Sequence, residues 1–122
     1  MRYKAIRWKY ILEEDVIVQT ELRPTTIRVI KGYARLLPNG KLYIFKGYAW
    51  DGCTGAPDRE WNMLAGLVHD VLYQMIQLGE LGWSHKELCD RQLQKLITIK
   101  PIGYIFYLAV HLFGQWFIRR PA

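Results

Sequence analysis

Two kinds of hydrophobic pattern divide the chain. Its first part holds short runs rich in β-branched and aromatic residues that partly alternate with charge: KAIRWKYIL, VIVQTEL, TIRVIKGYARLL and KLYIFKGYAW. Such runs, separated by EED, RPT and PNG, predict β-strands. The tripeptide Pro38-Asn39-Gly40 stands between two apolar runs and therefore predicts the tight turn of a hairpin.

From residue 58 the hydrophobic period becomes helical. Apolar residues recur at three- and four-residue spacing from Trp61 to Met75, and Gly79 is a typical stop. A second helix is expected to begin at SHKE, where Ser84 and Glu87 can form a capping box, and to run to about Ile99. Pro101 then starts a third helical segment.

The third segment, PIGYIFYLAVHLFGQWFI, holds eighteen residues without formal charge. As a helix it would reach about 27 Å, just under the roughly 30 Å hydrocarbon core of a bilayer. Three interpretations stay open: a spanning helix, an interfacial anchor and a buried packing helix, of which the last is favoured. We therefore expect no transmembrane segment.

These patterns predict an α+β fold in which a small N-terminal antiparallel β-sheet is followed by three α-helices. At 122 residues we expect a single domain spanning residues 1–122. Its parts are a β-sheet part (1–46), a glycine-rich loop (47–57) and a helical part (58–120).

Composition and charge narrow the function classes. An apolar share of 51% with 23% charged residues excludes a disordered chain. The net charge of +6 lies in residues 1–46, where ten Lys and Arg face four Asp and Glu, against seven of each afterwards. A basic surface of Arg28, Lys31 and Arg35 could meet phosphates of lipid or nucleic acid, or could serve only solubility.

One histidine and one aspartate form the candidate catalytic pair. His69 and Tyr73 are four residues apart and share a helix face, whereas Asp70 is turned about 100 degrees away. Asp90 lies midway along the next predicted helix. If the two helices pack antiparallel, Asp90 can face His69, fix its tautomer and leave the other ring nitrogen as a general base.

A glycine-rich loop precedes these helices, with the sequence KGYAWDGCTGAPD. Glycines let a loop turn its carbonyls inward, and calcium prefers carboxylate and carbonyl oxygens. Asp51, Gly52 and Asp70 are therefore candidate calcium ligands.

Two resemblances rest on these motifs. The runs GYAWDGCTG, LVHDVLYQ and YIFYLAVHLFG resemble a family of small uncharacterised domains common in tailed-phage and prophage genomes, which implies the host cytoplasm or the virion as location. The residues His69, Asp70, Tyr73, Cys89 and Asp90 are similar to the His-Asp-x-x-Tyr and Cys-Asp motifs of calcium-dependent phospholipases A2. That resemblance implies that His69 activates water and that Asp90 orients His69, with Tyr73 as a hydrogen-bond neighbour. It also implies that Asp70 and the loop around Asp51 hold calcium.

Other enzyme classes fit less well. The sequence has no Gly-x-Ser-x-Gly elbow, no His-Glu-x-x-His zinc motif and no histidine before His69. Two cysteines suit a reducing compartment, and nucleophilic catalysis by Cys53 stays open.

Two hypotheses remain. One is a calcium-assisted ester hydrolase acting on lipid at a membrane surface. The other is a non-enzymatic phage component that binds another phage protein, or less readily nucleic acid, with the His/Asp motif as a structural polar core. Both predict a hydrogen bond between His69 and Asp90.

Overall fold

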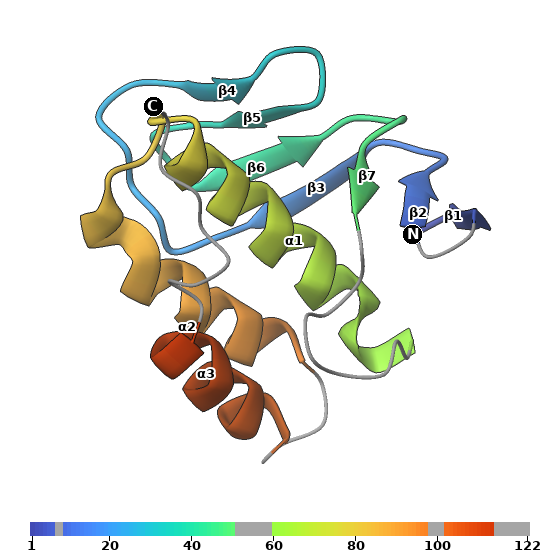
Figure 1. Cartoon of the computed structure of the whole chain (residues 1–122). Coiled ribbons are helices and arrows are strands. Elements are labelled where there is room, and N and C mark those ends of the chain that lie inside the picture. Colours follow the sequence, from blue (N-terminus) through green and yellow to red (C-terminus); the bar gives the residue numbers. More distant parts are fainter. Residues whose placement is uncertain (7–8, 51–59, 98–101, 114–122) are drawn as a thin grey trace.

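The structure is a computed structural model that describes residues 1–6, 9–50, 60–97 and 102–113. Its strands form two antiparallel sheets instead of the one predicted (Figure 1). The smaller sheet has the order β1-β2-β7 and the larger sheet the order β3-β6-β5-β4. The bounds are β1 Tyr3–Ile6, β2 Lys9–Leu12, β3 Val16–Gln19, β4 Arg28–Ile30, β5 Ala34–Leu36, β6 Lys41–Ile44 and β7 Ala49–Trp50. The predicted α+β class, with strands before helices, is confirmed.

The predicted hairpin at Pro38-Asn39-Gly40 is confirmed. It joins β5 to β6, and Leu37 and Lys41 close it through an N–H···O bond of 2.9 Å. Gly40 has a φ of 89°, which favours glycine. A second turn divides the run TIRVIKGYARLL into β4 and β5, with Gly32 at a φ of 81°. The sequence pattern predicts one strand over that run, and the structure has two.

The basic surface predicted from Arg28, Lys31 and Arg35 does not form on one face of the sheet. Arg28 stands directly opposite Leu36, whose side chain is fully buried, whereas Arg35 is exposed on the other face. Successive side chains of a strand alternate between faces, and the intervening turn reverses the chain. The side chains of Arg28 and Arg35 therefore project from opposite faces of the sheet. Lys31 is exposed in the turn between them.

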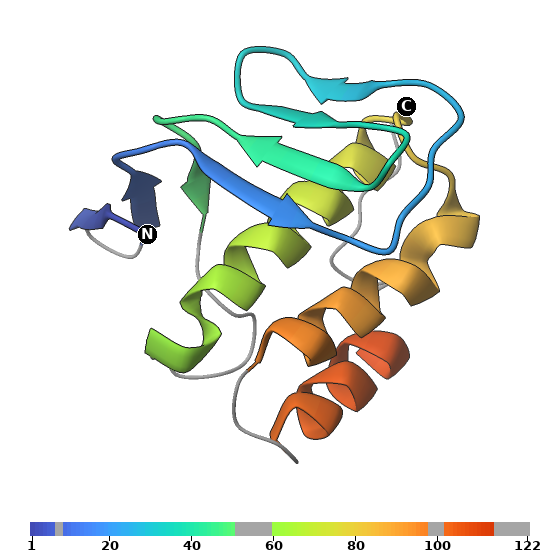
Figure 2. The ribbon, with the colours of Figure 1, turned by 180° about the vertical axis from the view of Figure 1, so that it is seen from behind.

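The helices lie on one side of the larger sheet. Their bounds are α1 Glu60–Gln77, the 3₁₀ turn η1 Trp83–His85, α2 Lys86–Leu96 and α3 Ile102–Phe113. Figures 1 and 2 show α1 crossing the sheet, α2 antiparallel beside α1, and α3 on the far side of α2. The three predicted helices are thus present among the described residues.

A common hydrophobic core joins the sheet to α1. Leu36, Leu42 and Ile44 of the sheet and Leu67 and Val71 of α1 are all fully buried in it. At about 25 cal/mol per Å² of apolar surface, such burial is the main force that holds α1 in place. The position of α1 in turn sets the position of every polar residue on its other face.

Of the two local signals predicted for the end of α1 and the start of α2, only the first is confirmed. Gly79, at a φ of 80°, follows α1 and is the predicted stop. The predicted capping box of Ser84 and Glu87 is wrong: Ser84 lies within η1, and α2 starts at Lys86 without a side-chain cap. The side chain of Glu87 instead contacts α3, because tertiary partners are within its reach.

The third helix is only half buried. Ile102 and Val110 pack against Leu93 and Ile97, but a stripe of apolar residues faces outward: Tyr104, Ile105, Leu108 and Leu112. The favoured expectation of a buried packing helix is therefore met on one face alone. Among the described helices, none is long and apolar enough to cross a membrane.

Candidate active site

His69 and Asp90 meet at the interface of α1 and α2. Their contact joins His69 Nε2 to Asp90 Oδ1 at 3.0 Å, and both side chains are buried, with exposures of 7% and 0%. Residues midway along two antiparallel neighbours come face to face, as the spacing predicted. The predicted hydrogen bond is thus confirmed, whereas a catalytic role stays a prediction.

Tyr73 completes the arrangement one helical turn after His69. Its hydroxyl donates to Asp90 Oδ1 at 2.5 Å, and its ring centroid lies 3.9 Å from that of His69. The same carboxylate oxygen therefore accepts from both residues of the α1 face. These contacts hold the imidazole and the carboxylate in one fixed relation.

Asp90 is an anion in this environment. Burial alone would raise its pKa, but hydrogen bonds from His69, Lys86 and Tyr73 together lower the pKa below its ordinary value. A buried carboxylate stays ionised only when donors and opposite charge replace the lost water. Asp90 therefore only accepts hydrogen bonds.

The ionisation of Asp90 fixes the tautomer of His69. An ionised carboxylate needs a donor, so Nε2 carries the proton. Burial lowers the pKa of His69, against the opposing effect of Asp90, and the neutral imidazole then has its lone pair on Nδ1. Within the described residues Nδ1 has no hydrogen-bond partner. Such a nitrogen can act as a general base.

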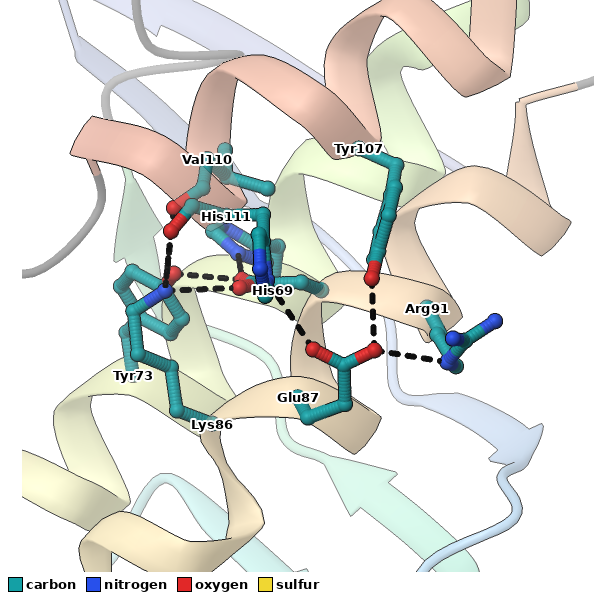
Figure 3. A network of polar contacts seen from close by, with 9 residues as sticks. His69, Tyr73, Lys86, Glu87, Arg91, Tyr107, Val110 and His111 are labelled. Atoms are coloured by element: carbon teal, nitrogen blue, oxygen red, sulfur yellow. Dashed lines mark hydrogen bonds and ion pairs between the residues drawn. The ribbon is translucent and has the colours of Figure 1, made fainter.

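Lys86 is a member of the site that the sequence analysis missed. Its ammonium donates to Asp90 Oδ2 at 2.8 Å and to the backbone carbonyls of Val110 at 3.0 Å and His111 at 3.3 Å (Figure 3). The ion pair links residues four apart on α2. That spacing in KELCD was a usable signal, because Lys and Asp four apart share a helix face.

A second cluster beside it docks α3 onto α2. Glu87 Oε1 accepts from Tyr107 at 2.5 Å and from Arg91 at 2.9 Å, and Oε2 lies 3.0 Å from His111 Nδ1 (Figure 3). The Tyr107 hydroxyl, with Arg91 and His111, lowers the pKa of Glu87. The neighbouring residues Lys86 and Glu87 thus both contact α3.

The predicted calcium ligands are only partly described. Asp70 is half-buried on α1, while Asp51, Gly52 and Cys53 lie outside the described residues. Among the described side chains, no group of three or more His, Cys, Asp or Glu could hold a metal ion. Calcium binding therefore remains a prediction that depends on the 47–57 loop.

Cys89 lies next to the site but has no chemical role in it. It is a free and fully buried thiol, and burial together with the neighbouring Asp90 raises its pKa. A thiol that does not ionise is a poor nucleophile. Cys89 therefore acts as a small apolar residue of the core.

Comparison of the chain with protein-family models, with curated proteins and with solved structures found no match.

Proposed function

We propose that the protein is an ester hydrolase in which His69 activates water and Asp90 orients His69. The observation that supports this most is the contact of 3.0 Å between His69 Nε2 and the ionised Asp90, which directs Nδ1 away from the pair. A neutral imidazole held in one tautomer by a carboxylate is a standard arrangement for a general base.

The residues would act in a simple order. His69 Nδ1 takes a proton from a water molecule as the water oxygen attacks the ester carbonyl. Asp90 stabilises the imidazolium that forms, and Tyr73 keeps the carboxylate in place. His69 then returns the proton to the leaving alkoxide oxygen as the ester bond breaks, which restores the neutral imidazole.

Calcium belongs to the same proposal. Its ligands would be Asp70 with Asp51 and the backbone at Gly52. The proton transfers above use His69, Asp90 and Tyr73 alone and are therefore independent of the ion.

The proposed substrate is a lipid at a membrane surface. Support comes from the exposed apolar stripe of α3 and from the excess of positive charge, which suits anionic headgroups. Residues 98–122 contain Lys100, Arg119 and Arg120 and no acidic residue. From the resemblance to a phage and prophage domain family, we propose that the protein is a phage or prophage product that acts in the host cytoplasm or the virion.

The test measures fatty-acid release from mixed anionic phospholipid vesicles with calcium. His69→Gln keeps a polar side chain that can still donate to Asp90, so the fold should survive while release falls to background. His85→Gln, a histidine in η1 outside the site, should release fatty acid like wild type. Equal release by His69→Gln and wild type at matched melting temperatures would refute the proposal.

A second function has its own supporting observation. Each oxygen of Asp90 is hydrogen-bonded, and the ammonium of Lys86 has three acceptors, so the cluster is satisfied without a ligand. Buried charges paired in this way can serve architecture alone. On this basis the protein would be a non-enzymatic phage component that binds another phage protein. No release by wild type, with a loss of melting temperature in His69→Ala, would favour it.

A further inference from the structure

We propose that Lys86 is a positioning residue that links the docking of α3 to the geometry of the His69–Asp90 pair. The relevance of this link to catalysis rests on the proposed hydrolase; the link itself does not. One ammonium group contacts the carboxylate of the pair on one side and backbone carbonyls of α3 on the other (Figure 3).

The donors of Lys86 are fully used. An ammonium has three N–H groups, and three acceptors surround it: Asp90 Oδ2 and the carbonyls of Val110 and His111. Its side chain is only 15% exposed. If either partner moves, the ammonium must move with it or lose a hydrogen bond in a nearly dry environment, where an unpaired donor is costly.

The contact with α3 is made through its backbone. Val110 and His111 lie on α3, and their carbonyl oxygens accept from the ammonium at 3.0 Å and 3.3 Å. Hydrogen bonds from a charged donor are stronger than those between neutral groups. Lys86 thereby helps to keep α3 against α2.

The contact with Asp90 reaches His69 through one carboxylate. Lys86 holds Oδ2, while His69 and Tyr73 hold Oδ1. A rotation of the carboxylate toward a displaced Lys86 would change the length and angle of the bond to His69. Displacement of α3 is therefore transmitted to the imidazole, and a change at Asp90 is transmitted to α3.

The experiment perturbs each end and measures the other by NMR at a single pH. Asp90→Asn should speed hydrogen exchange of the α3 amides about tenfold, within the usual range of coupling between sites. Tyr107→Phe removes the α3 hydroxyl that binds Glu87 and should move the ¹⁵N resonances of the His69 ring. Tyr104→Phe deletes an exposed hydroxyl of the same helix and should leave those resonances in place.

The faster exchange of the α3 amides and the shift of the His69 resonances should both disappear in a Lys86→Met background. Both should persist in a Lys95→Met background, which removes an exposed lysine of α2. The inference is overturned if Asp90→Asn leaves α3 exchange unchanged, or if Tyr107→Phe moves His69 equally without Lys86. Should Lys86→Met not fold, the pair Tyr107→Phe and Tyr104→Phe decides in the wild-type background, where equal shifts would overturn it. Because no substrate is used, this outcome is independent of whether the protein hydrolyses esters.

Discussion

Tyr73 and Asp90 are joined by a hydrogen bond of 2.5 Å that crosses from α1 to α2. Tyr73→Phe removes this bond, and hydrogen bonds to charged groups are the stronger ones. We expect the free energy of unfolding, measured in urea, to fall by about 1.5 kcal/mol. The control is Tyr43→Phe on the larger sheet, expected to change stability by less than about 0.5 kcal/mol. Equal losses in the two variants would contradict a special role for the bond.

Stability should decline on acidification in two steps. Burial lowers the pKa of His69 in the folded chain. As pH falls through about 6.5, His69 therefore binds a proton in the unfolded chain but stays neutral in the folded chain. Stability is therefore complete above that pH and falls below it. Asp90 also has a lowered pKa, so its contribution is lost at still lower pH, as pH falls through its folded pKa. Urea unfolding from pH 8 to pH 5 should show the first step in wild type and a smaller one in His69→Gln.

Calcium should bind weakly and depend on Asp70. Sites on extracellular modules have dissociation constants up to about 10⁻³ M, so the titration needs millimolar ion and NMR or thermal shift detection. Asp70→Asn removes one ligand charge and should abolish saturable binding, while Glu13→Gln, an exposed carboxylate on the N-terminal part, should not. Absence of saturation in wild type would remove calcium from the proposed mechanism.

Lipid binding should require the outward face of α3. Ile105 and Leu112 are each 59% exposed, so replacing both by Ser removes apolar area without disturbing the core. We expect flotation with anionic vesicles to weaken more than tenfold, since each apolar side chain contributes about 1.5 kcal/mol or more. The matched control is Ile17→Ser with Ile27→Ser in the N-terminal part of the chain, where these side chains are 60% and 52% exposed. A similar loss in both pairs, or none, would argue against α3 as the lipid contact.

A side chain at Gly40 should destabilise the protein more than a side chain at Gly47. Both glycines have a positive φ, but only Gly40 has close neighbours. A Cβ at Gly40 would lie 2.5 Å from the carbonyl of Thr20 and 2.8 Å from that of Leu22. Gly47 has a similar φ of 99° but nothing within 4 Å. Gly47→Ala should cost about 1 kcal/mol from backbone strain alone. Gly40→Ala should cost measurably more by thermal denaturation, and equal losses would show that the backbone relaxes.

Local chemistry made several features predictable from sequence. The turn at Gly40, the stop at Gly79 and the helical face shared by His69 and Tyr73 follow from short-range rules. The meeting of His69 with Asp90 needed one further assumption, that two helices joined by a short connection pack antiparallel. That assumption is confirmed (Figure 1), and the prediction that His69 meets Asp90 depended on it.

Features that depend on distant partners were not predictable in the same way. The strands divide into two sheets because β2 pairs with β7 and β3 pairs with β6. The alternation of apolar and polar residues along a strand does not indicate which other strand it pairs with. Glu87 matched a capping box by spacing, yet contacts from Tyr107 and His111 place it elsewhere. The contact of Lys86 with α3 depends on how α3 packs against α2, which the sequence pattern does not give.

The strand order of the larger sheet has a consequence for how the chain reaches its fold. β4, β5 and β6 are consecutive and joined by short turns, so their pairing closes small loops. β3 must pair with β6 across the whole of residues 20–40, which costs more chain entropy. We therefore expect the meander of residues 28–44 to form first, and β3 and the helices to pack onto it afterwards.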